Sequence, residues 1–185
     1  MSKAYRNFWS LNVDEAVVSG ILRDETVKNV EVLFPLNSQM KDVDLFLLNL
    51  KNKKVATIQV KSSRAYEPKK SEIDKYEYGS AGWFYFKKEV VLNSAADYFI
   101  FLIYVLEESK EKGRRIIVPH TITIESSKLI DLCLKNKKSD SKGLYSFFIW
   151  VNPKEKKAFD FRDQEYSLSD YLDKKGFEKL NLKLK

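Results

Sequence analysis

The sequence predicts an α/β domain, spanning residues 1–185, in which a central mixed β-sheet is flanked by helices. Three observations support this fold class. Segments with helical spacing alternate along the chain with short apolar segments typical of strands. The run Asp97–Leu106 is almost continuously apolar, as expected for a strand that is covered on both faces. At 185 residues, with 44% hydrophobic and 14% aromatic residues, the chain is long enough to bury a sizeable core.

The first expected elements are a helix and a short strand. The helix runs from Val13 to about Lys28, because Asn12 can cap it, two acids suit its positive N-terminal end, and apolar residues keep helical spacing. The strand, Val30–Phe34, follows and ends at Pro35.

Several polar side chains at one end of an apolar hairpin are the most informative feature of the chain. Two strands are expected near residues 43–50 and 55–61, joined by a lysine-rich turn. Asp44 opens the first strand, and Gln59 and Lys61 close the second, two residues apart and therefore on one face. Acids and lysines are costly in a buried strand unless they are paired or bind a metal. An acid, a side-chain carbonyl and a lysine together predict the site of a Mg²⁺-dependent phosphodiesterase.

The segment from residue 64 to residue 93 cannot be assigned from its pattern. It mixes charged side chains with aromatic ones, a combination that in some proteins stacks nucleic-acid bases. Packing in the core and at its rim is the favoured interpretation. The aromatic residues are Tyr66, Tyr76, Tyr78, Trp83, Phe84, Tyr85 and Phe86.

The last third of the chain completes the same domain. The expected elements are a strand at 115–118, a helix at 126–135, hairpin strands at 144–151 and 157–162, and a helix at 167–180. The last helix is expected to be capped by Ser167 and to end near Gly176 or just beyond it. His120 is the only histidine, and a packed or surface position is the favoured interpretation.

Composition excludes several classes of protein. The single Cys133 rules out an intramolecular disulfide and a cysteine-based zinc site. The N-terminal residues hold no uninterrupted apolar run of the signal-peptide kind, and no run is long enough to span a bilayer as a helix. Neither of the common glycine-rich phosphate loops is present, so no nucleotide cofactor is expected. We expect a cytoplasmic protein with no membrane partner.

Positive charge is concentrated around the hairpin. The net charge is +7, and residues 51–70 hold seven basic side chains and one acidic one, whereas residues 1–40 hold four basic and five acidic ones. Basic clusters attract polyphosphates, although a solvated turn of lysines is an equally good interpretation. The candidates for nucleic-acid binding are Lys51, Lys53, Lys54, Arg64, Lys69 and Lys70.

The order of the polar residues resembles a known nuclease superfamily. Glu15 on the first helix, Asp44 at the start of a strand and Gln59-Val60-Lys61 on the next strand resemble the PD-(D/E)xK superfamily, and most of all its Gln-x-Lys branch. This branch includes restriction-type endonucleases, some intron-encoded endonucleases and proteins similar to Holliday-junction resolvases. The resemblance implies a restriction-endonuclease-like core at about residues 12–106, with residues 115–185 completing the domain.

The resemblance also implies a role for each matching residue. Asp44 matches the metal-binding acid, and Gln59 matches the second ligand position. Glu15 matches the acid that often completes the metal shell, directly or through water. Apart from the resemblance, the preference of Mg²⁺ for oxygen ligands makes the backbone oxygen of Val60 a further expected ligand. Lys61 matches the lysine that orients the attacking water or stabilises the developing charge. The implied metal is Mg²⁺, with Mn²⁺ accepted as well.

Two departures from the family pattern bear on activity. Val43 stands where the motif has its proline, and Gln59 replaces an acid, which removes one negative charge and weakens the hold on a metal. Asp42 is a rival to Asp44, because both precede the strand. Asp44 is preferred because it adjoins the apolar run directly.

The predicted function is metal-dependent endonucleolytic cleavage of DNA, in restriction, intron-type or junction-resolving biology. Cutting two strands with one small domain predicts a homodimer. A catalytically inactive nucleic-acid-binding or assembly module with the same fold is the second reading. A third is an unrelated α/β protein with an incidental motif, in which the residues of the motif do not converge in space.

Overall fold

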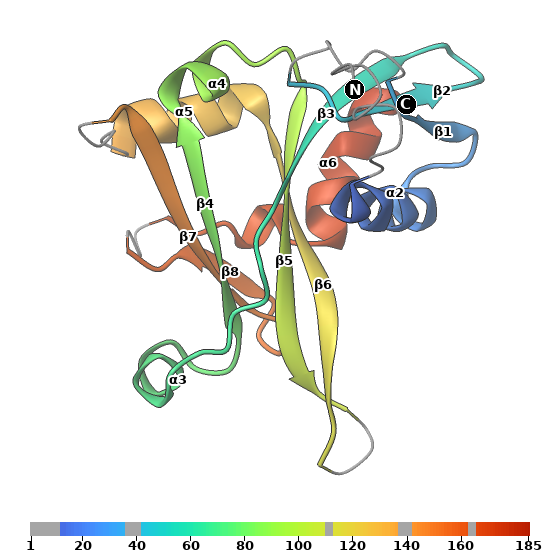
Figure 1. Cartoon of the computed structure of the whole chain (residues 1–185). Helices are drawn as coiled ribbons and strands as arrows, with labels where there is room; N and C mark the ends of the chain where they lie inside the picture. The colour runs from blue at the N-terminus through green and yellow to red at the C-terminus, as the bar shows by residue number, and fades with distance from the viewer. Residues whose placement is uncertain (1–11, 36–41, 110–112, 137–141, 163–165) are drawn as a thin grey trace, which may run out of the picture.

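A five-stranded mixed sheet, sheet A, forms the middle of the molecule (Figure 1). The computed structural model describes residues 12–35, 42–109, 113–136, 142–162 and 166–185. The first three strands of sheet A form an antiparallel meander, the third is parallel to the fourth in space, and the last pair is antiparallel. In spatial order the strands are β1 (Val30–Leu33), β2 (Leu45–Asn49), β3 (Val55–Ser62), β5 (Tyr98–Glu108) and β6 (Arg115–Glu125).

Two helices cover one face of sheet A. They are α2 (Val13–Glu25) and α6 (Lys174–Leu184). Alternate residues of β3 point toward them, because side chains along a strand alternate between its faces. The apolar cluster between these layers includes Val18, Leu22, Ala56, Ile58, Val60, Ile100, Phe177 and Leu180.

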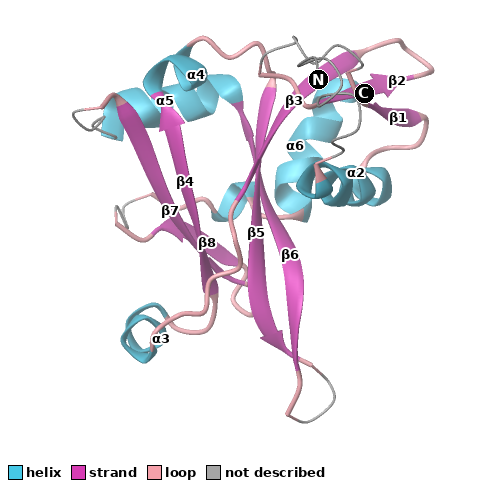
Figure 2. Ribbon diagram, viewed as in Figure 1, coloured by secondary structure: helices cyan, strands magenta, loops and turns pink. Residues whose placement is uncertain are grey.

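A second sheet, sheet B, covers the other face (Figure 2). It is antiparallel and consists of β4 (Ser80–Lys87), β7 (Leu144–Asn152) and β8 (Lys157–Asp160). The two sheets approach closely at Gly82, where a Cβ atom would lie 2.7 Å from Cγ1 of Ile103. The ring of Phe84 meets that of Phe101 edge-on at 5.0 Å between centroids. Helices α3 (Lys70–Tyr76), α4 (Lys88–Leu92) and α5 (Ser126–Asn136) lie at the two ends of this layer.

The α/β class and the mixed sheet agree with the prediction, and the predicted hairpin strands at 144–151 and 157–162 form β7 and β8. Their pairing with β4 in a second sheet was not predicted. The unassigned segment holds α3, β4 and α4. The sixth strand is also longer than predicted, since it continues through Pro119 and His120. It pairs within sheet A only with β5, and a strand at the edge of a sheet tolerates a proline because one side of its backbone needs no partner.

The predicted helix at 167–180 is wrong in its start and in its end. A short 3₁₀ helix, η1 (Ser169–Tyr171), comes first, and α6 begins only after Asp173, whose φ of 46° breaks the helical path. Gly176 lies inside α6 rather than at its end. A Cβ atom there would lie 2.4 Å from the carbonyl oxygen of Tyr171, so this glycine permits close packing. Within the described parts of the chain, no helix is both long and apolar enough to cross a membrane.

Candidate active site

Asp44 lies just before β2 and contacts β3 with both its backbone and its side chain. Its N–H donates to the carbonyl oxygen of Ile58 at 2.8 Å. Its Oδ2 accepts from Nε2 of Gln59 at 2.8 Å and from the backbone N–H of Val60 at 2.6 Å. The rival acid, Asp42, lies in the preceding turn with a φ of 69°. Asp44 is therefore the acid that meets the Gln-x-Lys segment.

The backbone of Val60 presents polar groups to Asp44. Its N–H points away from β5 and toward Asp44. In an extended strand the N–H and C=O of one residue point to the same side, so the carbonyl oxygen of Val60 also faces this side. A carboxylate oxygen and a backbone oxygen are thus available at one place.

The side chain of Gln59 carries an unpartnered oxygen. The residue is 4% exposed, and its Nε2 is used by Asp44. Among the described residues, no donor reaches its buried Oε1. Turning the amide over would press Oε1 against the carboxylate of Asp44, so the orientation follows from the hydrogen bond. A buried acceptor without a partner costs roughly 1–3 kcal/mol, and a bound cation or water would remove this cost.

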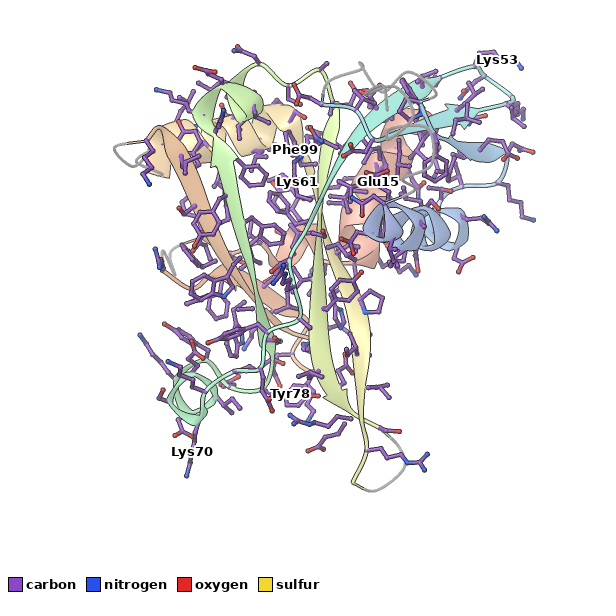
Figure 3. All side chains as sticks on the ribbon, viewed as in Figure 1. Glu15, Lys53, Lys61, Lys70, Tyr78 and Phe99 are labelled. Atoms are coloured by element: carbon purple, nitrogen blue, oxygen red, sulfur yellow. The ribbon has the colours of Figure 1, made fainter. Side chains whose placement is uncertain are left out.

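Glu15 brings a second carboxylate from the first turn of α2. Burial raises the pKa of Glu15 above its ordinary value, and the negative charge of Asp44 raises it further. A hydrogen bond from Asn12 and the positive charge of Lys61 act in the opposite direction. Glu15 is therefore close enough to feel both Asp44 and Lys61. Figure 3 shows Glu15 and Lys61 on neighbouring elements, α2 and β3.

The structure thus brings together the four residues that the sequence predicts as catalytic. Asp44 and Gln59 are in direct contact, and Glu15 and Lys61 interact electrostatically. The contact between Asp44 and Gln59 is one that an incidental motif does not require.

Asp14 holds α2 in place and was not predicted as a site residue. Tyr104 on β5 donates its hydroxyl to Oδ1 of Asp14 at 2.7 Å, and Ser62 at the end of β3 donates to Oδ2. Burial, and then the hydrogen bond and charge of Asp14, raise the pKa of Tyr104 to about 12. The sequence signals only an acid at a helix start. Its partners are 48 and 90 residues away, so local patterns do not show them.

The oxygen atoms in this region are of the chemical kind that hard divalent cations bind. Carboxylates of Asp44 and Glu15, Oε1 of Gln59 and the carbonyl of Val60 are ligands of the kind that Mg²⁺ prefers. In the part of the chain that the structure describes, no group of three or more His, Cys, Asp and Glu side chains is placed to hold a metal ion. A metal here would accordingly take amide and backbone oxygens as well as carboxylates.

The six predicted nucleic-acid-binding residues fall into separate groups. Three are in the β2–β3 turn, at the far end of the hairpin from Asp44, roughly 17 Å along the strand from Gln59. Two others stand at the start of α3, and Figure 3 shows the labelled Lys53 and Lys70 on opposite sides of Lys61. Arg64 follows β3 directly. The turn residues are Lys51, Lys53 and Lys54, and those at α3 are Lys69 and Lys70.

Comparisons with protein-family models, with curated proteins and with solved structures found no match to this chain. The interpretation of the site therefore rests on its geometry and chemistry.

Proposed function

We propose that the protein is a metal-dependent endonuclease with a restriction-endonuclease-like core, which hydrolyses DNA phosphodiester bonds in the cytoplasm. The observation that carries the proposal is the buried, unpartnered Oε1 of Gln59 beside the carboxylate of Asp44. A polar atom that is buried without a partner lowers stability, so its retention needs a reason such as a bound ligand. The order of helix, strand and strand that carries these residues supports the proposed core.

Four groups would hold the metal: the carboxylates of Asp44 and Glu15, Oε1 of Gln59 and the carbonyl of Val60. When bound, Mg²⁺ or Mn²⁺ would supply an acidified water and neutralise charge on the scissile phosphate. The protein prepares the site by fixing Asp44 with two N–H donors, so that its carboxylate needs no rearrangement.

Lys61 stabilises the charge that develops on the phosphate during hydrolysis. It lies two residues after Gln59, on the same face of β3, and its charge already influences Glu15. A positioned ammonium group acts on charge that is larger in the transition state than in the substrate. Because one site cuts one strand, we propose a homodimer for cleavage of duplex DNA or of a junction.

A catalytically inactive nucleic-acid-binding or assembly module is the second candidate. The hydrogen bond from Nε2 of Gln59 to Asp44 favours it, because this carboxylate already has a hydrogen-bond donor and depends less on a metal ion. In this case the same fold would hold DNA without cutting it.

Cleavage of supercoiled plasmid and of a synthetic four-way junction, each with Mg²⁺ or Mn²⁺, separates the two candidates. The proposal expects metal-dependent cutting that falls by roughly 10²–10³ in Lys61→Ala. Lys128→Ala, which removes an exposed lysine from α5, is the matched control and should cut as the wild type does. Binding of both substrates without cutting would favour the inactive module, and neither binding nor cutting would reject both candidates.

A further inference from the structure

The outer face of sheet B carries exposed aromatic rings. Side chains of β4 alternate, so that Phe84 and Phe86 enter the core while Trp83 and Tyr85 point outward. Trp83 is 36% exposed and Tyr85 is 56% exposed. Large aromatic side chains usually bury most of their surface, so Tyr85, which is more than half exposed beside the partly exposed Trp83, requires an explanation.

Neighbouring rings hold these side chains in fixed orientations. The buried ring of Phe148 meets Trp83 edge-on at 4.6 Å and Tyr85 edge-on at 5.9 Å between centroids. Tyr66 lies 5.9 Å from Trp83 at a tilt of 50°. Tyr66, Trp83 and Tyr85, with Phe148 beside Trp83 on the neighbouring strand β7, are called the aromatic platform below. A platform that is already ordered loses little conformational entropy when it binds a flat ligand.

Positive charge borders the aromatic platform. The guanidinium carbon of Arg162 lies 3.4 Å from the ring centroid of Phe148 and 6.0 Å from that of Trp83. Arg64 lines the same hollow as Tyr66 and Trp83.

Two acids on the segment that follows Tyr66 already have partners. Glu72 accepts from the hydroxyl of Tyr66 at 2.7 Å and from the N–H of Lys69 at 2.8 Å. Glu67 pairs with Arg115 at 2.7 Å. The cations of Arg64 and Arg162 beside the platform suit a phosphate backbone.

The platform begins where the candidate active site ends. Ser63, two residues beyond Lys61, accepts the backbone N–H of Trp83 at 2.9 Å. Two residues of strand span roughly 7 Å. An open hollow of about 340 Å³ extends from there, and its lining consists of Ser63, Arg64, Ala65, Tyr66 and Trp83.

We infer that the aromatic platform binds a single-stranded segment of DNA, whose bases stack on Trp83 and Tyr85 and whose phosphates meet Arg64 and Arg162. Bases within a duplex stack on each other and do not offer their faces, whereas unpaired bases do. Resting on the proposed function, this inference names the substrate class: DNA with an unpaired segment beside the bond to be cut.

Binding without metal tests the inference separately from catalysis. The probes are a fluorescently labelled oligo(dT) of about 16 nucleotides and a blunt duplex of the same length, both with EDTA and followed by anisotropy. The variants are Trp83→Ala and Tyr85→Ala, with Trp83→Phe and Tyr85→Phe to keep a ring. Ile117→Ala removes an equally exposed apolar side chain from β6 and is the matched control.

The expected result is a rise in the Kd for oligo(dT) of about tenfold in Trp83→Ala and of a smaller amount in Tyr85→Ala, with the duplex unaffected. Both phenylalanine variants and Ile117→Ala should bind as the wild type does. Circular dichroism tests whether Trp83→Ala is folded. If Trp83→Ala is unfolded, the binding of Tyr85→Ala decides the question. Unchanged affinity for oligo(dT) in the folded alanine variants, or an equal loss for oligo(dT) and duplex, would overturn the inference.

The outcomes also separate this inference from the proposed function. If the protein cuts no DNA but binds oligo(dT) through the platform, the proposed nuclease activity is rejected and the inference about the platform is supported. If the protein cuts DNA with metal and the platform variants bind oligo(dT) as the wild type does, the nuclease activity is supported and the inference about the platform is rejected.

Discussion

Two groups of polar side chains in this molecule differ in how completely their atoms are partnered. In the His120 cluster, formed by Glu107, His120 and Asp173, both ring nitrogens are bonded, to Asp173 at 2.8 Å and to Glu107 at 2.9 Å. Burial lowers the pKa of His120, but the two carboxylates raise it more, so that it ends above its ordinary value.

In the Asp44 cluster, formed by Glu15, Asp44, Gln59 and Lys61, one acceptor is left over and one carboxylate has a raised pKa. A satisfied network stabilises a fold, whereas a buried group without a partner requires an explanation, and a bound ligand is one such explanation. The comparison favours a structural role for the only histidine of the sequence and supports the proposal that the less conspicuous Gln59 belongs to the functional site.

The largest effect on stability is expected at Asp173. Asp173→Ala leaves Nδ1 of His120 and the N–H of Thr121 without their acceptor, which should lower the free energy of unfolding by about 2 kcal/mol. Urea denaturation measures the change. Asp170→Ala removes an exposed acid from the same segment and should change stability little. Equal losses of stability in the two variants would contradict the stabilising role given to the hydrogen bonds of Asp173.

A metal-linked gain in stability is the next largest effect. Mg²⁺ at ten times its Kd should stabilise the wild type by about 1.4 kcal/mol, because the cation binds the folded site only. Asp44→Asn should lose most of this gain, and His120→Gln should keep it. Thermal unfolding with and without Mg²⁺ provides the measurement. If His120→Gln loses the gain and Asp44→Asn keeps it, the metal binds at the His120 cluster and not at the Asp44 cluster.

The smallest effect concerns Glu15 and pH. Because the pKa of Glu15 is raised in the folded protein, ionisation disfavours folding, and stability falls as the pH rises from 4.5 through the folded-state pKa. Glu15→Gln should therefore be slightly more stable than the wild type at pH 7 without metal. The difference should vanish below pH 4.5. Denaturation at both pH values tests this, and a destabilised Glu15→Gln at pH 7 would contradict it.

The hairpin and its polar end were predictable from the sequence because their signals are local. Alternation of side chains places Gln59 and Lys61 on one face, and a short turn returns β3 along β2. Asp44 and Gln59 are 15 residues apart and meet within a single hairpin. The helix that carries Glu15 was also predicted, although it ends at Glu25 rather than near Lys28.

The pairing of β4 with β7 in sheet B and the start of α6 were not predictable, because distant contacts decide them. The aromatic segment forms a strand only because β7 pairs with it and β5 lies beneath it. Asp173 interrupts the C-terminal helix while its carboxylate accepts from Thr121, 52 residues earlier. The strand expected at 115–118 continues through Pro119, because its position at the edge of sheet A accommodates a proline. Each of these errors arises where tertiary structure overrides a local preference.

The position of Asp44 within a short hairpin also has a consequence for refolding. The bonds from Gln59 and Val60 to Asp44 close loops of 15 and 16 residues, whereas those that place α2 against the sheet close loops of 48 and 90. Short loops close at a lower entropic cost and sooner. We therefore expect Asp44, Gln59 and Val60 to assemble early, with Glu15 arriving when the helix docks. A refolding chain would then acquire weak cation affinity first and its full affinity only at the end.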